Sequence, residues 1–468
     1  MDPRFLPHNS HLDGLAAFEE RDPQLRILRG LPLVHRPALL SQLPRSVPGI
    51  YTVGGGRQIG KSTLLKLWVR ELLREGVAPP RIAYFTGELI DDHHALVRLV
   101  SEHLADQPRP EPTFLAVDEV TYIREWDRGV KYLADAGLLE DTVLVITGSD
   151  LTFLREARMR LPGRRGPAHV ANFHLFPLSF REMLKLKGSL DDPDEVFDPK
   201  RAPRPETLRI LFEELEQYLM HGGYLTAVND LAQEGTIRPS TFATYQEWIR
   251  GDVLKRGKHE SYLREVLGAI VNRYGSQVSW NALARELSID HPQTVADYVA
   301  LLASMDAVFV QPALREEALA PAPKKPKKVL FADPFIFHAV RSWLKPVANP
   351  FAEQVRVAVG DPEWAGRLAE ACVTAHFQRY FPTYYLKAEG EVDVAVVHGG
   401  RFWPIEVKWT GQVRPKDLKQ VRKYQNGVVW GRVRRSGSLE GVPVEPLPLA
   451  LARITERGPA PLCLAEAR

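Results

Sequence analysis

The chain has 468 residues, 44% of them hydrophobic and 25% charged, a composition typical of a multi-domain globular protein. Lys and Arg outnumber Asp and Glu by 61 to 58, so the net charge of +3 permits a nucleic-acid partner without requiring one. The sequence contains no apolar run of transmembrane length, no secretory signal, and no metal or redox spacing at Cys372 and Cys463, so we expect a cytoplasmic protein without a membrane partner.

The first strong signal is a glycine loop between a β-rich run at 50–53 and a helical pattern of leucines. The loop, "GGGRQIGKST", fits G-x4-G-K-[ST], whose backbone N–H groups surround nucleotide phosphates at the start of a helix. This predicts binding of ATP and Mg²⁺, with Lys61 on the β- and γ-phosphates and Ser62 on the metal ion. The predicted nucleotide-binding residues of the loop are Gly55, Gly56, Arg57, Gln58, Ile59, Gly60, Lys61, Ser62 and Thr63.

Further strands alternate with helical patterns, which predicts an α/β fold with a parallel sheet. The run "TFLAVDEV" ends on an acidic pair, so we expect Asp118 to help bind Mg²⁺ and Glu119 to polarise the attacking water. The next strand, at 142–150, ends near Ser149, which is either a sensor of the γ-phosphate or the N-cap of a helix.

Two adjacent arginines, Arg164 and Arg165, lie in the glycine-bounded loop "PGRRGP". One of them is a candidate arginine finger that acts on the nucleotide of a neighbouring subunit, which would require a homo-oligomer. The alternative is a solvated basic loop.

Together these motifs resemble the archaeal and bacterial P-loop ATPases of AAA+ type whose C-terminal part looks like a PD-(D/E)xK nuclease. The resemblance runs from about residue 45 to residue 430 and also rests on "HGGYLTAV", "KVLFADP", "EVDVAVV" and "PIEVKWTG". The sequence departs from the family pattern at Gly56, Thr121 and Asp150, none of which removes a charged catalytic group. The resemblance implies ATP hydrolysis and a DNA-related or regulatory role.

The middle of the chain reads as helical over 186–255, which we interpret as the lid of the ATPase, followed by a winged-helix pattern in 261–310. Its wing carries the basic run "APAPKKPKKVLF", and a second basic run, "RPKDLKQVRKY", lies further on. We expect these runs to contact DNA phosphates, with a solvated loop as the alternative. The expected phosphate contacts are Lys324, Lys325, Lys327, Lys328, Lys416, Lys419, Arg422 and Lys423.

Near the C-terminal end, two predicted strands form a hairpin at Gly399 and Gly400. Alternation puts Glu406 and Lys408 on one side of the second strand, where Asp393 of the first strand can meet them. Asp393 and Glu406 are predicted Mg²⁺ ligands, and Lys408 is predicted beside the attacking water of phosphodiester cleavage. The helix predicted over 366–381 supplies Glu370 as an auxiliary carboxylate.

The expected organisation is therefore α/β and multi-domain: an N-terminal segment (1–45), a P-loop ATPase core (46–185), a helical lid (186–255), a winged helix (256–345) and a restriction-endonuclease-like domain (346–468). The leading function is an ATP-hydrolysing enzyme that remodels, translocates on or cleaves DNA, with branched or single-stranded DNA as candidate partners. The alternatives are an ATP-dependent signalling switch whose C-terminal domains bind a protein, and a DNA-binding module with a degenerate nuclease.

Overall fold

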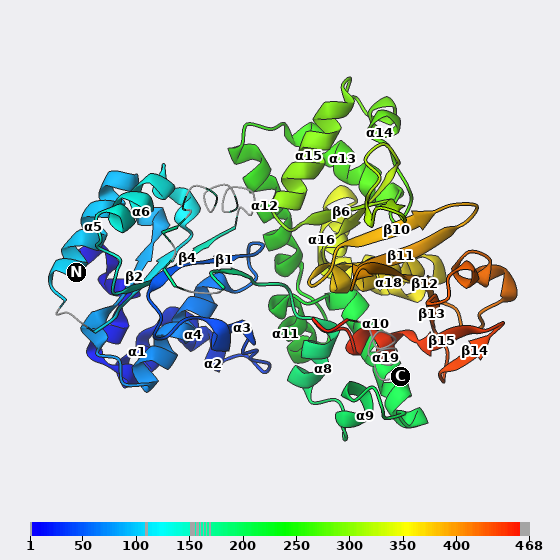
Figure 1. Ribbon diagram of the computed structural model, residues 1–468, viewed down its shortest axis with the longest axis horizontal. Helices are drawn as coiled ribbons and strands as arrows, with labels where there is room; N and C mark the ends of the chain where they lie inside the picture. Colours follow the sequence, from blue (N-terminus) through cyan, green and yellow to red (C-terminus); the bar gives the residue numbers. More distant parts are fainter. Residues whose placement is uncertain are drawn as a thin grey trace. The chain divides into compact units, whose positions relative to one another are not determined.

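The computed structural model describes residues 2–107, 111–149, 155, 159, 161, 163–164, 166–167 and 170–458. The chain divides into two compact units, Met1–Phe176 and Pro177–Arg468, which we describe separately. Figure 1 shows the elements of both units. The segments expected to form the helical lid, the winged helix and the nuclease-like domain all fall within the second unit.

The first unit is built on a parallel sheet with the strand order β2-β3-β4-β1-β5. Because β4 lies between β1 and β3, the carboxyl ends of these three strands meet at one edge, where ligands bind in open α/β sheets. The strands of this sheet are β1 (Gly49–Gly54), β2 (Ile82–Thr86), β3 (Thr113–Asp118), β4 (Thr142–Gly148) and β5 (Asn172–His174).

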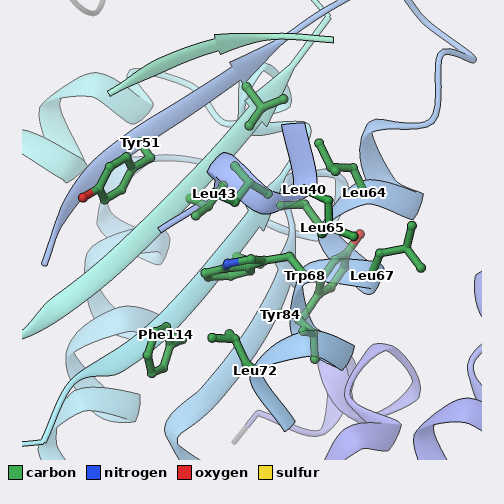
Figure 2. Packing of buried hydrophobic residues seen from close by; sticks show 14 of the residues in the cluster. Leu40, Leu43, Tyr51, Leu64, Leu65, Leu67, Trp68, Leu72, Tyr84 and Phe114 are labelled. Carbon is green, nitrogen blue, oxygen red and sulfur yellow. The ribbon is translucent and has the colours of Figure 1, made fainter. Parts of the chain in front are cut away.

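Helices cover both faces of this sheet, so its strands are apolar on both sides. Alternate residues of β2 face opposite cores: Tyr84 packs with Trp68 of α4, whereas Phe85 packs with Trp126 of α6. Figure 2 shows the first of these cores, in which Trp68 and Tyr84 lie among the leucines of α4. The helices in the described part of this unit are α1 (Leu15–Arg21), α2 (Pro23–Arg29), α3 (Leu39–Gln42), α4 (Lys61–Arg74), α5 (His93–Ala105) and α6 (Trp126–Asp135), with short 3-10 turns η1 (Pro3–His8), η2 (Ser10–Asp13), η3 (Pro79–Arg81), η4 (Gly87–Leu89) and η5 (Val120–Tyr122).

The N-terminal segment packs directly on the ATPase sheet. The side chain of Asn9 accepts a hydrogen bond from the backbone N–H of Tyr84 and donates one to the Tyr84 carbonyl, both at 2.8 Å. His11 Nε2 lies 2.8 Å from the carbonyl oxygen of Ile82. β2 is an edge strand, so its outer backbone N–H and C=O groups have no neighbouring strand to pair with. The contacts of Asn9 and His11 supply partners for some of these groups.

The second unit begins with a set of helices that includes the break predicted at Gly222 and Gly223. An alanine Cβ at Gly222 would lie 1.7 Å from Asp333 Oδ1, and Gly223 N donates a 2.7 Å hydrogen bond to Asp333 Oδ2. The motifs "HGGYL" and "LFADP" are therefore packing partners. The helices up to this point are α8 (Phe180–Lys187), α9 (Asp194–Phe197), α10 (Pro205–His221), α11 (Leu225–Glu234) and α12 (Pro239–Lys255).

Three helices and a β-hairpin follow in the order expected for the 256–345 segment. The hairpin pairs β6 with β9 in antiparallel register, and a single bridge joins Val278 to Lys327. The buried amide of Gln311 in β6 donates hydrogen bonds to the carbonyl oxygens of Tyr384 and Asp393, which attaches the hairpin to the C-terminal sheet. The elements are α13 (Glu260–Asn272), α14 (Trp280–Glu286), α15 (Pro292–Ser304), β6 (Val308–Pro312), β7 (Leu314–Arg315), β8 (Ala320–Pro321), β9 (Lys327–Phe331) and α16 (Pro334–Leu344).

The C-terminal sheet has the strand order β10-β11-β12-β13-β15-β14 and is covered on one face by α18. The β11/β12 hairpin turns at Gly399 and Gly400, both at positive φ, as the sequence predicts. Its elements are η6 (Phe351–Val355), α17 (Arg356–Gly360), α18 (Pro362–Gln378), β10 (Thr383–Lys387), β11 (Glu391–His398), β12 (Arg401–Lys408), η7 (Pro415–Leu418), η8 (Val421–Lys423), β13 (Val428–Gly431), β14 (Gly437–Leu439), β15 (Val442–Pro446) and α19 (Leu447–Ala452).

Pro404 does not mark an edge strand, contrary to what a proline in a strand suggests. β12 lies between β11 and β13. However, β12 pairs with β13 only from Ile405 onward, so Pro404 precedes the stretch where a second neighbour needs its backbone N–H.

Candidate functional site

The glycine loop between β1 and α4 has the backbone geometry that its sequence requires. Gly55 has φ +150°, and a Cβ there would lie 2.5 Å from the carbonyl oxygen of Leu175. Gly60, at φ +100°, is the N-cap of α4 and has no side-chain capping bond among the described residues. The N-terminus of this 14-residue helix therefore presents backbone N–H groups and a positive dipole end, which suits a phosphate.

Lys61 lies within the loop and is 4% exposed. Its Nζ donates hydrogen bonds to the carbonyl oxygens of Gly55 (3.1 Å) and Gly56 (2.9 Å). The same Nζ lies 3.4 Å from Oε1 of Glu119. This buried ammonium is held by two neutral carbonyl groups and by a single carboxylate. The negatively charged oxygens of a phosphate can therefore replace these contacts.

Asp118, at the end of β3, is held from two sides. The Thr147 hydroxyl donates a 2.5 Å hydrogen bond to its Oδ1, and the Tyr84 hydroxyl donates a 2.6 Å hydrogen bond to its Oδ2. Burial, followed by the charge of Asp118, raises the pKa of Tyr84 well above its usual value, so this hydroxyl keeps its proton. Ser62 hydrogen-bonds with the same hydroxyl. Tyr84 thus joins the two residues predicted to bind Mg²⁺.

Glu119 has a left-handed backbone conformation, with φ +50°, directly after β3. Such strain in a non-glycine residue persists where the surroundings fix it. The Thr147 hydroxyl accepts a 2.9 Å hydrogen bond from Glu119 N, and the Ser149 hydroxyl donates a 3.2 Å hydrogen bond to Glu119 Oε2. Ser149 therefore touches the candidate general base. The alternative role as a helix N-cap depends on the residues after Ser149, which lie outside the described residues.

The other predicted loop residues lie around this centre. Arg57 Nη2 donates a 2.9 Å hydrogen bond to the hydroxyl of Tyr122, and the Thr63 hydroxyl donates a 3.3 Å hydrogen bond to Oε1 of Gln24. Gln58 has a left-handed backbone. Ile59 contacts the position where a Cβ on Gly55 would lie.

Of the two candidate arginine fingers, the structure describes Arg164. Arg164 forms an ion pair with Asp135, the last residue of α6, and its side chain is 30% exposed. Arg165 lies outside the described residues. A finger role for Arg164 would require it to leave Asp135.

In the second unit, Asp393, Glu406 and Lys408 come together as the hairpin pattern predicts. Lys408 Nζ lies 2.5 Å from Glu406 Oε1 and 3.9 Å from Asp393 Oδ2. Asp393 Oδ2 also accepts a 2.9 Å hydrogen bond from the backbone N–H of Val407. Glu406 is 6% exposed, and its Oε2 has no hydrogen-bond partner in the described structure. Burial, with the Asp393 carboxylate adding to it, raises the pKa of Glu406 to about 8.

A metal ion in this place would have two carboxylates to bind. Within the described residues, no group of three or more His, Cys, Asp or Glu side chains is arranged to hold a metal. Mg²⁺ usually binds one or two carboxylates and completes its shell with water and substrate phosphates. Asp393 and the unpartnered Oε2 of Glu406 fit that requirement.

Glu370 lies in α18 but is paired elsewhere. Its Oε1 is 2.6 Å from Nζ of Lys328, whose Nζ is also 2.5 Å from Oε1 of Glu391. Burial raises the pKa of Glu370 to about 7. Burial disfavours the charged amine of Lys328, but Glu370, Asp393 and Glu391 outweigh it and raise the pKa of Lys328 above its usual value.

The expectation that Lys328 contacts DNA phosphate is wrong, because its side chain is 1% exposed and is engaged by two glutamates. Neither this pairing nor the part of Glu391 was predicted. The alternation of β9 held a signal for the burial of Lys328, though not for its partners: Lys328 shares a face with Leu330 in a strand that reads "KVLF".

The other predicted phosphate contacts lie at the surface, and several have internal partners. Lys325 Nζ donates to the carbonyl oxygen of Lys387, and Lys327 Nζ donates to that of Pro323. Lys423 pairs with Glu389 at 2.6 Å. Arg422 likewise pairs with Glu440, at 3.2 Å. The remaining exposed side chains are Lys324, Lys416 and Lys419.

Three segments of the chain match families of known proteins. Residues 48–184 match a family described as an AAA domain. Residues 212–346 and 365–436 match two families described as domains of unknown function, DUF8612 and DUF4143. The first unit thus carries a P-loop ATPase domain of the AAA type.

Two curated relatives are similar over about half of the chain. An uncharacterized protein of Haemophilus influenzae is 24% identical over 265 residues, covering 54% of this chain and 60% of the relative. An uncharacterized protein of Methanocaldococcus jannaschii is 26% identical over 253 residues, covering 50% of this chain and 51% of the relative. The chain therefore spans between half and three fifths of the length of these relatives.

Among solved structures, a Walker-type ATPase of Pyrococcus abyssi is 16% identical with a TM-score of 0.38, covering 62% of this chain and 91% of that one. A signal transduction ATPase with numerous domains from Pyrococcus horikoshii, which has a tetratricopeptide repeat sensor, is 14% identical with a TM-score of 0.27, covering 74% and 48%. Across the described part of the chain, every helix is too short or too polar to cross a bilayer.

Proposed function

We propose that this protein is an ATP hydrolase of AAA type that acts on DNA and carries a second, Mg²⁺-dependent site for phosphodiester cleavage. The observation that carries the proposal is the meeting of Lys61, Asp118 and Glu119 at the carboxyl ends of β1 and β3. Lys61 would bind phosphate, Asp118 would bind the metal ion, and Glu119 would accept a proton, so each step has its own side chain.

The division of labour between the two acidic residues follows from their contacts. Asp118 is buried and held at both oxygens, which suits a fixed metal-binding role with Ser62. Among the described residues, the Glu119 carboxylate has Ser149 and Lys61 as its polar contacts, so it can turn toward a water molecule. Mg²⁺ would neutralise phosphate charge, and Lys61 would exchange its carbonyl contacts for phosphate oxygens.

Cleavage in the second unit is supported by the order α18-β10-β11-β12-β13 and by the residues that it aligns. β10, β11 and β12 form an antiparallel meander, and β13 joins it in parallel. We propose that Asp393 and Glu406 bind Mg²⁺ and that Lys408 contacts the attacking water or the phosphate. Bound Mg²⁺ would lower the pKa of that water and neutralise the scissile phosphate.

DNA binding is proposed for the exposed basic residues of the second unit, with Lys328 left out. Lys324, Lys416 and Lys419 are the exposed set, and Lys325, Lys327, Arg422 and Lys423 would exchange internal partners for phosphates. Such contacts hold DNA without reading its sequence. A homo-oligomer is proposed because Arg164 or Arg165 would act on the nucleotide of a neighbour.

The first test measures ATP hydrolysis by the full chain without DNA and with single-stranded, duplex and branched DNA. We expect turnover to rise several-fold with at least one DNA and to vanish in Lys61→Ala. Turnover that is retained in Lys61→Ala would overturn the ATP-site assignment.

The second test measures Mg²⁺-dependent cutting of the same DNAs. We expect Asp393→Asn to abolish cutting, whereas Glu389→Gln, a change to a carboxylate that is 74% exposed, should leave it intact. Cutting that survives in Asp393→Asn refutes the site.

A second candidate is an ATP-dependent signalling switch whose second unit binds a protein. It is favoured by the number of basic side chains that already have internal partners and by the docking of the β6/β9 hairpin through Gln311. ATP hydrolysis that is unchanged by any DNA, with no DNA retained at low salt, would favour the switch over the DNA enzyme.

A further inference from the structure

The pairing of Lys328 with Glu370 and Glu391 affects how many metal ions the acidic site of the second unit can hold. Four carboxylates gather where α18, β11 and β12 meet: Glu370, Glu391, Asp393 and Glu406. Two-metal nucleases use such a set to hold two ions about 3.5–4 Å apart. Here, two lysines lie among the four carboxylates.

Lys408 and Lys328 differ in how easily each can move away from its carboxylate partners. Lys408 faces Asp393 and Glu406 with a side chain that is 27% exposed, so an incoming ion can displace it toward solvent or substrate. Lys328 is 1% exposed, and its ammonium contacts Glu370 and Glu391 at 2.6 and 2.5 Å. Leaving these partners would strand a buried charge, which is costly.

The surroundings of Lys328 hold it in place. Its strand, β9, is paired along its length with β6, and β6 is attached to the C-terminal sheet through Gln311. Its Nζ also lies 5.6 Å from the centre of the Tyr385 ring. Glu391 receives a further hydrogen bond from the Gln277 amide. The ammonium is therefore a fixed cation built into one half of the acidic cluster.

The other half of the cluster offers a buried carboxylate oxygen to an ion. Glu406 Oε2 is buried without a hydrogen-bond partner, next to Asp393. A divalent ion can satisfy this atom, whereas a second ion beside Glu370 would meet the Lys328 ammonium at short range and be repelled.

We propose that the ammonium of Lys328 takes the place of a second metal ion, so that this site binds a single divalent cation at Asp393 and Glu406. The inference rests on the proposed metal site. It makes Glu370 a partner of Lys328 and not a metal ligand.

Mn²⁺ binding to the nucleotide-free full chain tests the inference by counting ions in electron paramagnetic resonance titrations. We expect Asp393→Asn to bind one Mn²⁺ fewer than the wild type. Lys328→Met, which frees Glu370 and Glu391, should bind one more, and Lys328→Arg should match the wild type. An unchanged count in a folded Lys328→Met variant would overturn the inference.

A second measurement does not depend on the folding of the Lys328→Met variant. Wild-type protein saturated with Mn²⁺ should give only the spectrum of isolated ions. A spectrum of two exchange-coupled ions that is lost in Asp393→Asn would overturn the inference, although the metal site itself would stand. A Mn²⁺ count that Asp393→Asn does not change would instead refute the metal site itself, and the inference with it.

Discussion

The hydroxyl of Tyr84 donates a 2.6 Å hydrogen bond to Oδ2 of Asp118, across neighbouring strands β2 and β3. The ring of Tyr84 is buried beneath the Nζ of Lys66, 3.7 Å from its centre, and its backbone is held by Asn9. The N-terminal segment, the helix after the glycine loop and the acidic pair are thus connected through one residue, Tyr84.

Tyr84→Phe should weaken Mg²⁺ binding in the ATP site, because it removes one of two donors that hold Asp118. A hydrogen bond to a charged group contributes roughly 1.5–3 kcal/mol, so the Mg²⁺ concentration for half-maximal ATP hydrolysis should rise about tenfold or more. Tyr51→Phe is the matched control, because among the described residues the Tyr51 hydroxyl donates to the carbonyl oxygen of Val47. Equal Mg²⁺ dependence in the two variants would contradict a positioning role for Tyr84.

Glu119→Gln should separate ATP binding from hydrolysis. The amide keeps the shape of the side chain and its contact with Ser149 but cannot accept a proton, so turnover should fall by about 10²–10⁴-fold. Binding of a fluorescent ATP analogue should stay within a few-fold of the wild type. Phosphate release at more than a tenth of the wild-type rate would exclude Glu119 as the general base.

The buried ion pair between Lys66 and Asp22 should be important for the stability of the first unit. Lys66 Nζ lies 3.0 Å from Asp22 Oδ2, and the two residues are 3% and 0% exposed. Removing one partner leaves a buried charge, so Lys66→Met should lower the free energy of unfolding by about 3–5 kcal/mol.

Urea denaturation of the full chain measures this effect. The exposed pair Arg21–Asp13 is the control, and Arg21→Ala should cost less than about 1 kcal/mol. Similar losses in the two variants would show that burial of the Lys66–Asp22 pair does not matter.

The sequence predicted those elements whose signals lie in neighbouring residues. The glycine loop predicted a strand before it and a helix after it: β1 (Gly49–Gly54) contains the expected run 50–53, and α4 begins at Lys61, at the end of the loop motif. The turn at Gly399 and Gly400 predicted the β11/β12 hairpin, and side-chain alternation predicted that Glu406 and Lys408 would meet Asp393.

Contacts between distant segments were not predictable in this way. Tyr84 reads as an ordinary aromatic residue in a buried strand, and only the strand order brings it to Asp118. Lys328 reads as one of four lysines in a basic loop, because the two glutamates that bury it lie 42 and 63 positions further on. A single sequence holds no signal for pairs of this kind.

Gly222→Ala should destabilise the second unit severely. The residue has φ +57° and ψ −152°, a region that is open almost only to glycine, and a Cβ would lie 1.7 Å from Asp333 Oδ1. We expect a loss of more than about 3 kcal/mol in urea denaturation. Gly235→Ala also places alanine at positive φ but in open space, so it should cost only about 1 kcal/mol. Equal costs would show that the clash with Asp333 is relieved by movement.

His338 should make the second unit less stable in mild acid. Its Nε2 lies 2.9 Å from the carbonyl oxygen of Leu219, and burial lowers the pKa of His338 to about 4. The unfolded chain, with a histidine pKa of about 6.5, takes up a proton between these values that the folded chain does not. Stability that is fully present above pH 6.5 is therefore lost as the pH falls toward 4.

The variant His338→Gln isolates this contribution from other titrating groups. Glutamine keeps a donor for Leu219 but does not titrate, so the stability difference between wild type and variant should shrink by roughly 1.3 kcal/mol from pH 7.5 to pH 5.5. Urea denaturation followed by circular dichroism at the two pH values measures it. A constant difference for His338→Gln would mean that this buried imidazole takes up its proton in the folded state as readily as in the unfolded chain.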